Sequence, residues 1–304
     1  MKHKEFHKLM SLQEQEKRAA GDESTADLYR AVRNHFNNYN HGREFFLADM
    51  TPEVVYGFIE WLRGKELRVN SVNSYLSNLR AMYNRACRRW RKKPPESPFA
   101  GLRLRREDTS KRAIPAEVIG QIASLDLKAE PRKQQAVDMA LFSFMACGMP
   151  FVDLVHLTQE NLSEDGKVLS YYRRKTGALI RIEVSEGMQT LMDRYNREDT
   201  KYLFPALSED ASHEQYKHCL ACQNQYLDEI RVQLGLDGKL TTYVFRHTWA
   251  SEAYHRHVPI AIISQALGHS SEKMTRIYLS AFGLRELAEA NRQVSGKVEL
   301  LVVG

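Results

Sequence analysis

Three residues near the C-terminal end of the chain have the types and order that phosphodiester cleavage requires: Arg246, His269 and Tyr278. A tyrosine is a weak nucleophile at its ordinary pKa of about 10. Its attack on phosphorus therefore needs cations and hydrogen-bond donors held against the non-bridging oxygens. The planar guanidinium of Arg246 can hold two such oxygens and does not lose its charge. This combination predicts a phosphodiester-breaking site.

Two motifs around these residues carry a family resemblance. Residues 267–278 read LGHSSEKMTRIY and resemble L-G-H-x-S-x-x-x-T-x-x-Y, the C-terminal signature of the tyrosine recombinases, or phage-integrase family. Residues 243–250 resemble the second family motif, H-x-x-R-H-x-x-A. The resemblance implies that Tyr278 attacks DNA to form a 3′-phosphotyrosine, while Arg246 and His269 stabilise the transition state.

The second motif departs from the family at its first position, where Tyr243 stands in place of the usual His. A tyrosine hydroxyl can donate a hydrogen bond to a phosphate oxygen but cannot act as a base near neutral pH. We therefore predict a hydrogen-bonding role for Tyr243, and a buried core aromatic is the alternative. Either Thr241 or Thr242 is expected to cap the helix, and His247 is expected to be structural.

Residues 171–184 predict two short strands around a turn that contains glycine. This segment resembles the family's β-hairpin, whose tip lysine reaches DNA and protonates the leaving 5′ oxygen. The resemblance implies that Lys175 is this general acid. Without the neighbouring motifs, a lysine at a hairpin tip is usually a solvated turn residue.

The first family motif, commonly G-L/M-R-x-x-E/D, is incomplete in residues 141–157. Asp153 matches its acidic position, but Pro150 stands at the usual arginine position. A branch of the family that writes this motif with F-V-D, the Bacteroides-type branch that this chain resembles, carries the arginine just before the glycine. Cys147 stands there in this chain. Losing one preorganised donor typically lowers a rate by about 10²–10³.

Three explanations of the missing arginine are open. Cys147 is a substituted or engineered position, another cation such as Arg173 or Arg174 compensates, or the protein binds DNA without efficient cleavage. The first is favoured because every other catalytic position is filled. It predicts that Cys147→Arg raises the cleavage rate and that Pro150→Arg does not.

The charge distribution agrees with a nucleic-acid partner. The net charge is +6, and between Arg80 and Arg112 there are twelve basic residues against three acidic ones. A basic run of this kind beside Trp90 suits phosphate contacts and counterion release, and a solvated helix face is the alternative. The residues predicted to contact DNA are Arg88, Arg89, Arg91, Lys92, Lys93, Arg173 and Arg174.

The same stretch marks the predicted domain boundary, because the prolines in residues 92–98 end any helix. We predict a helical core-binding domain of the SAM-like type over residues 1–92, a basic linker over 93–112, and a catalytic integrase domain over 113–304. In the first domain, capping boxes or caps at Ser24 and Thr51 and a start near Asn70 predict three helices. Pro115 suits the first turn of the next helix.

The sequence gives little support for a disulfide-rich, metal-binding, membrane-spanning or secreted protein. The four cysteines are too few and too scattered for a disulfide framework. Cys219 and Cys222, with His213 and His218 nearby, lack a second pair at zinc-finger spacing, and residues 211–234 predict one continuous helix, so we expect no metal. No apolar run is long enough to span a membrane and no signal-peptide core is present. We expect a cytoplasmic, nucleoid-associated bacterial protein.

Together these features predict a mainly α-helical, two-domain fold with a small β-sheet, and the activity of a site-specific DNA recombinase or integrase. The bond energy is kept in the covalent intermediate, so no cofactor is expected. The predicted partner is double-stranded DNA, on which residues 283–304 would link protomers into a homotetramer. A DNA-binding regulator derived from a recombinase is the alternative, and a type IB topoisomerase is less favoured.

Overall fold

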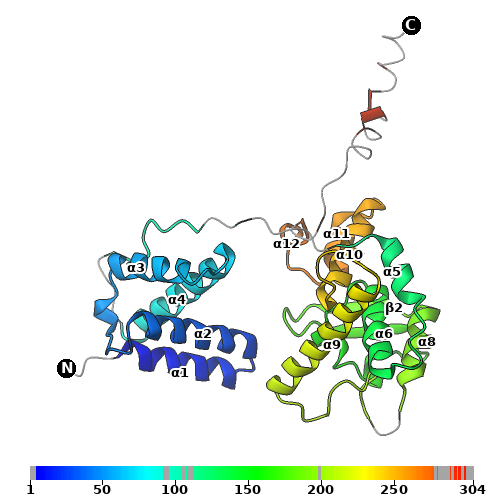
Figure 1. The fold of residues 1–304 in the computed structure, drawn as a ribbon, viewed down its shortest axis with the longest axis horizontal. Coiled ribbons are helices and arrows are strands. Elements are labelled where there is room, and N and C mark those ends of the chain that lie inside the picture. The colour runs from blue at the N-terminus through cyan, green and yellow to red at the C-terminus, as the bar shows by residue number, and fades with distance from the viewer. Residues whose placement is uncertain are drawn as a thin grey trace. The chain divides into compact units, whose positions relative to one another are not determined.

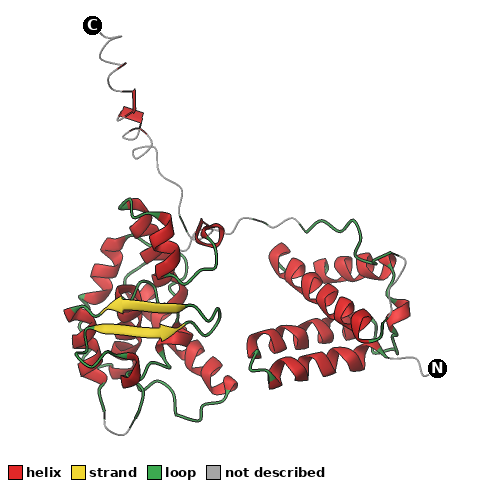
Figure 2. Cartoon of the chain, turned by 180° about the vertical axis from the view of Figure 1, so that it is seen from behind, coloured by secondary structure: helices red, strands yellow, loops and turns green. Residues whose placement is uncertain are grey.

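The computed structural model describes residues 5–91, 96–104, 107, 113–197 and 200–276, together with residues 279, 288, 291, 292, 294, 295 and 298. The chain divides into two compact units, residues 1–109 and 110–304. The described part is mainly helical and contains one two-stranded sheet (Figures 1 and 2). The predicted fold class is confirmed.

The first unit is a bundle of helices with an aromatic core. Its elements are α1 (Phe6–Ala19), α2 (Glu23–Tyr39), a short 3-10 turn (Leu47–Asp49), α3 (Pro52–Arg63) and α4 (Val69–Arg89). Phe36 lies at the centre of the core, and the rings of Phe6, Phe45 and Phe58 meet it edge to face. Because edge-to-face contacts between aromatic rings are favourable beyond the area they bury, this cluster joins α1, α2 and α3.

The helix starts in this unit agree only partly with the sequence. Thr51 accepts a hydrogen bond from the backbone N–H of Val54, as a cap of α3 should. The expected capping box at Ser24 is wrong, because α2 begins at Glu23 and its N-cap is Asp22, which makes no side-chain cap. Helix α1, which packs along α2, was not among the predicted helices (Figure 1).

In the second unit the central helix is α6, which contacts α5, α8, α9 and α10. Its helices are α5 (Ala116–Ala123), α6 (Pro131–Met145), α7 (Phe151–Leu154), α8 (Glu186–Tyr195), α9 (His213–Gln233), α10 (Thr242–His255), α11 (Ile260–Ala266) and α12 (Glu272–Arg276). The continuous helix expected over residues 211–234 is confirmed by α9. Pro115 is the N-cap of α5 rather than part of its first turn.

The expected hairpin is also confirmed. Strands β1 (Val168–Tyr172) and β2 (Leu179–Glu183) pair antiparallel, with Tyr172 opposite Leu179 (Figure 2). One face buries Leu169, Tyr171 and Ile180 in the core of the unit, since alternate side chains of a strand point to the same face. The turn that connects the strands therefore projects from a base that is packed into the core.

Candidate active site

Arg246 lies in the second turn of α10, and its side chain is buried. Its guanidinium donates to the backbone carbonyl of Gly148 at 2.8 Å and to that of Leu267 at 2.7 Å. It also lies 3.1 Å from Nε2 of His269. Backbone carbonyls orient a guanidinium without neutralising its charge. Arg246 is thus held in one position and remains a full positive charge.

A second buried arginine reaches the same place. Arg173 follows β1, is 6% exposed, and donates through Nη1 to the carbonyl of Leu267, which also accepts from Arg246. Two guanidinium groups therefore meet at one carbonyl oxygen. The sequence predicts that Arg173 contacts DNA. The structure buries it beside Arg246 of the second motif and Leu267 of the C-terminal signature.

Asp153 holds Arg173 in this position. Its Oδ2 lies 2.7 Å from Nε of Arg173, and its Oδ1 accepts the backbone N–H of Arg174 at 2.9 Å. Asp153 belongs to α7 and is itself buried. The acidic residue of the first motif thus pairs with an arginine from the hairpin, about twenty residues further along the chain.

Two glycines allow the arginines to approach so closely. A Cβ on Gly148 would lie 2.9 Å from Cα of Arg246, and a Cβ on Gly268 would lie 2.9 Å from Cγ of Arg173. Both glycines have positive φ angles, +70° and +63°. Gly268 follows the end of α11, where a residue in the left-handed conformation is usually glycine. Any larger residue at either position would push an arginine away.

His269 follows Gly268 and uses both ring nitrogens. Arg246 can only donate, so Nε2 accepts from it and Nδ1–H donates to the hydroxyl of Thr275 at 2.8 Å. Burial and the charges of Arg246, Arg173 and Lys175 lower the pKa of His269 to about 4. The imidazole is therefore neutral at physiological pH, and in this arrangement it orients Arg246.

Lys175 lies at the tip of the hairpin and is exposed. Its charge is among those that lower the pKa of His269. The next residue, Thr176, donates from its hydroxyl to the carbonyl of Gly268 at 3.3 Å. This contact ties the hairpin tip to the turn between α11 and His269, and the exposed ammonium of Lys175 is left able to move toward a ligand.

Tyr243 lies in the first turn of α10 and is 41% exposed. This exposure contradicts the alternative of a buried core aromatic. Its ring contacts that of His247 at a centroid distance of 4.9 Å. Thr241 is the N-cap residue of α10, but among the described contacts it caps through its backbone carbonyl, which accepts the N–H of Val244 at 2.9 Å, and not through its side chain.

The two positions where an arginine was expected have other surroundings. Pro150 is the N-cap of α7, and Cys147 occupies a left-handed conformation with φ of 56°. Burial raises the pKa of the Cys147 thiol, so it stays uncharged. Both residues flank the turn whose Gly148 contacts Arg246. This turn thus contacts and orients Arg246 through Gly148. The other buried guanidinium group at this place is that of Arg173.

Several predicted residues lie outside the described ones. Tyr278 does, although Thr275 and Leu279 on either side of it are buried. Lys92 and Lys93 do as well, along with most of the tail over residues 283–304. Arg88, Arg89 and Arg91 belong to the first unit, at and just beyond the end of α4, and Arg174 is an exposed residue of the hairpin turn.

Thr275 was not among the predicted site residues, yet it is fully buried and accepts the Nδ1–H of His269, which helps to orient the ring. The fixed threonine of the L-G-H motif was a signal for it. In the described part of the chain no cluster of three or more His, Cys, Asp or Glu residues could hold a metal ion. No helix among the residues that the structure describes is long and apolar enough to cross a membrane.

Comparisons with known proteins agree with this architecture. The profile described as "Phage integrase family" matches residues 115–283, and that described as "Phage integrase SAM-like domain" matches residues 5–99. The first match covers more than half of the chain. The chain therefore belongs to the phage integrase family.

Individual relatives are distant. Tyrosine recombinase XerC of Leptospira interrogans is 23% identical over 265 residues, which span 85% of this chain and 83% of the relative. The integrase of the Tn1549 transposon, solved with transposon right end DNA, is 15% identical, with a TM-score of 0.67 over 95% of this chain and 99% of that one. A lambda integrase dimer bound to a core site is 14% identical, with a TM-score of 0.66 over 91% and 77%. These two structures share the fold.

Proposed function

We propose that the protein is a site-specific DNA recombinase that cleaves and rejoins double-stranded DNA through a 3′-phosphotyrosine at Tyr278. Membership of the phage integrase family supports this activity. So do the relatives, among them a tyrosine recombinase and integrases solved with transposon-end or core-site DNA. The single observation that carries the proposal is the convergence of Arg173 and Arg246 on one carbonyl oxygen.

The positive charge gathered here suits the binding of an anion. Among the described residues, Arg173 and Arg246 bring two buried guanidinium groups to one carbonyl, Asp153 pairs with Arg173, and the neighbouring His269 is neutral. Burying like charges together is unfavourable unless an opposite charge completes the site. A phosphodiester supplies one negative charge and oxygens that guanidinium groups bind in a forked geometry. As charge builds up on these oxygens during attack, the two arginines stabilise it further.

The proposed reaction needs only groups of this chain, DNA and solvent water. The Tyr278 phenol gives its proton to water as its oxygen attacks phosphorus, the bond from phosphorus to the 5′ oxygen breaks, and Lys175 gives the departing oxygen a proton. The phosphate remains on Tyr278 as a diester. In the second half, a 5′ hydroxyl attacks this diester and returns its proton to Lys175, and Tyr278 leaves and takes a proton back from water. We assign Tyr243, which is exposed in the first turn of the helix that carries Arg246, the donation of a hydrogen bond to a phosphate oxygen.

Arg173 takes the place of the missing first-motif arginine in this proposal. It is buried, it pairs with the acidic residue of that motif, and it shares a carbonyl acceptor with Arg246. These contacts favour compensation by another cation over a lesion at Cys147. They also remove the main reason for the alternative of an inactive DNA-binding regulator, which rested on the absence of a second arginine.

Finer features belong to the same proposal. The Phe151-Val152-Asp153 run supports assignment to the Bacteroides-type branch. We assign DNA contact to residues 1–92 and the linker 93–112, catalysis to residues 113–304, and homotetramer assembly on DNA to residues 283–304. Such a complex would work at the nucleoid.

A covalent-trapping experiment tests the activity. Nicked suicide substrates from the DNA that flanks the gene are mixed with the wild-type protein and with Tyr278→Phe. The wild type should form an adduct that resists denaturation, and Tyr278→Phe should form none, because only the wild type carries the nucleophile. Tyr254→Phe, which changes another tyrosine of the same unit, should still form it. Equal adducts from the wild type and Tyr278→Phe would contradict the proposal.

A further inference from the structure

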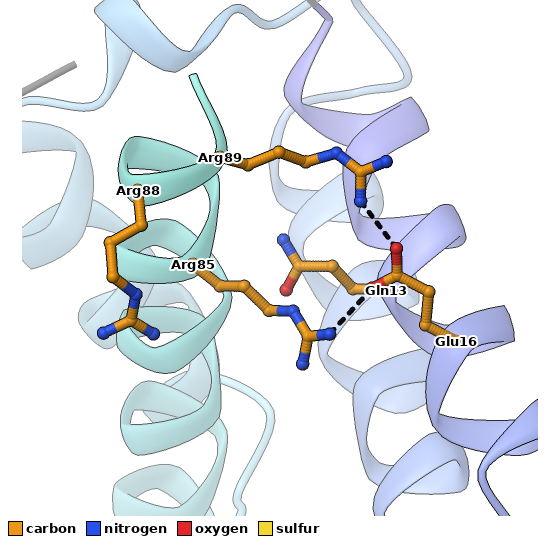
Figure 3. A pocket seen from close by; sticks show the side chains of 5 residues that line it. All are labelled: Gln13, Glu16, Arg85, Arg88 and Arg89. Atoms are coloured by element: carbon orange, nitrogen blue, oxygen red, sulfur yellow. Dashed lines mark hydrogen bonds and ion pairs between the residues drawn. The ribbon is translucent and has the colours of Figure 1, made fainter. Parts of the chain in front are cut away.

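A basic hollow lies between α1 and α4 of the first unit, which contains none of the residues of the proposed catalytic site. Its volume is about 420 Å³, and it is lined by Gln13, Glu16, Arg85, Arg88 and Arg89 (Figure 3). Three guanidinium groups and one carboxylate leave it with two more positive charges than negative ones. A phosphate group and several waters, each of roughly 30 Å³, fit in a space of this size.

Glu16 occupies two of the arginines. Its Oε2 lies 2.8 Å from Nη2 of Arg85, and its Oε1 lies 2.6 Å from Nη1 of Arg89 (Figure 3). These ion pairs lower the pKa of Glu16, with the hydrogen bond from Arg89 as the largest cause. The carboxylate is thus ionised at neutral pH. Its two oxygens receive guanidinium N–H groups in the way that two oxygens of a phosphodiester would.

The hollow still has unused hydrogen-bonding groups. Arg88 lines it, and its side chain makes no hydrogen bond or ion pair within the part of the chain that the structure describes. Arg85 and Arg89 each give Glu16 one nitrogen and keep others for a second acceptor. Gln13 is 1% exposed, and its Nε2 donates to the carbonyl of Met82. Its Oε1 accepts no hydrogen bond from the described residues and can take one from a freed arginine.

We propose that this hollow binds a phosphodiester group of the DNA backbone and that Glu16 competes with that group for Arg85 and Arg89. Arg88 binds the phosphate first, and the phosphate then replaces the carboxylate on one or both of the other arginines. Glu16 lowers the affinity for DNA of any sequence, because backbone contacts are independent of sequence. A recombinase that must leave non-target DNA and search for its site gains from this weakening. The inference rests on the proposed function only in taking DNA as the ligand.

The test is the change Glu16→Gln, which keeps the size of the side chain and removes its charge. Any such change also raises the net charge by one, so Glu60→Gln is the matched control, since Glu60 forms an ion pair with Arg63 in the same unit. Binding to a duplex of unrelated sequence is measured over a range of salt concentrations. Relative to Glu60→Gln, Glu16→Gln should bind about three- to tenfold more tightly. Its salt slope should steepen by about 0.9 for each additional phosphate that the protein neutralises.

A second variant checks that the tighter binding arises in the hollow. Adding Arg88→Gln to Glu16→Gln should remove most of the increase, because position 88 can no longer bind the incoming phosphate as a cation. If Glu16→Gln binds no more tightly than Glu60→Gln, or binds more weakly than the wild type, Glu16 is a support for the arginines and not a competitor. The readout is independent of Tyr278. Loss of covalent trapping with an intact Glu16 effect would overturn the proposed activity alone.

Discussion

At the scale of single residues, the site depends on where two buried positive charges are held. Arg246 comes from the second family motif, whereas Arg173 comes from the hairpin and is fixed by Asp153. Arg246 donates to two backbone carbonyls and lies against His269, whereas Arg173 forms an ion pair with Asp153. An ion-paired guanidinium still has N–H groups to offer a phosphate. This geometry is what supports the proposal that Arg173 takes the place of the missing first-motif arginine.

The change Arg173→Lys tests this replacement. Lysine keeps the charge beside Asp153 but loses the planar fork, so the rate of covalent cleavage at saturating protein should fall by about 10²–10³. Arg174→Lys alters the exposed neighbour and should leave the rate nearly unchanged. Cys147→Arg should give no increase if Arg173 already supplies the charge. A near-normal rate for Arg173→Lys, or a faster Cys147→Arg, would restore the lesion at Cys147 as the explanation.

His269 provides a prediction about pH. Its pKa is lowered from 6.5 to about 4 in the folded protein, so the unfolded chain binds a proton at pH 5 that the folded chain does not. The contribution of His269 to stability is complete above about pH 6.5 and is lost as the pH falls toward 4. The Tm of His269→Gln should therefore drop less between pH 7.5 and pH 5 than the Tm of the wild type. Equal drops in thermal unfolding experiments would mean that His269 is protonated in the folded state.

At the scale of elements, the site is formed where the turn after α11 meets the β-hairpin. Thr176 bonds to the carbonyl of Gly268, and Arg173 bonds to that of Leu267. Both carbonyls belong to the helix end, where they have no partner within the helix itself. The hairpin thus completes the hydrogen bonding of α11, and in return the helix end positions Arg173.

The change Gly268→Ala should disturb this junction. A left-handed φ costs a non-glycine residue on the order of 1–3 kcal/mol, and the new Cβ would also stand 2.9 Å from Cγ of Arg173 and 3.0 Å from Cδ1 of Ile180. Gly166→Ala is the matched control, because Gly166 has φ of +70° but nothing within 4 Å of an added Cβ. Chemical denaturation and cleavage rates should show a similar backbone cost in both variants and a loss of cleavage only in Gly268→Ala. Equal cleavage by the two would show that the close approach is dispensable.

At the scale of the whole molecule, charge and chemistry are divided between two units. The first carries the basic end of α4 with Arg88, Arg89 and Arg91, and the second carries the arginine pair. If these arginines have the roles proposed above, affinity for the DNA backbone and cleavage of one phosphodiester should be separable by mutation. This division suits a protein that must hold DNA while only one phosphodiester reacts.

Neutralising Arg88, Arg89 and Arg91 together should weaken binding to every duplex and reduce the salt slope by about 0.9 for each phosphate that the protein no longer neutralises. Sequence preference should not change, because backbone contacts carry no sequence information. The comparison protein neutralises Lys8, Arg30 and Arg63, which form ion pairs in the same unit, and should keep a nearly normal slope. If the two triple variants have equal slopes, the basic end of α4 is a solvated surface.

Local pattern determined much of this protein in advance. The motifs predict roles for Arg246, His269 and Lys175. Two strand-like runs around a glycine predict the hairpin, and a glycine such as Gly268 is typical directly after the end of a helix. Periodicity also held an unused signal for α1, in which Phe6, Leu9, Met10 and Gln13 are buried at helical spacing. Such features depend on neighbours a few positions apart, so they can be inferred without a fold.

Only the tertiary structure decided which charges meet. Arg173 and the carbonyl of Leu267 are separated by 94 residues, and Arg85 and Arg89 lie 69 and 73 residues from Glu16. An arginine side chain can pair with any acceptor that the fold brings within its reach, so its sequence neighbours do not identify its partner. The folded chain brings Arg173 to Asp153 and Glu16 to the basic end of α4, since burial and chain packing select those partners from many. For that reason the sequence left Arg173 and Arg174 as equal candidates for a compensating cation, whereas the structure buries Arg173 beside Arg246 and leaves Arg174 exposed.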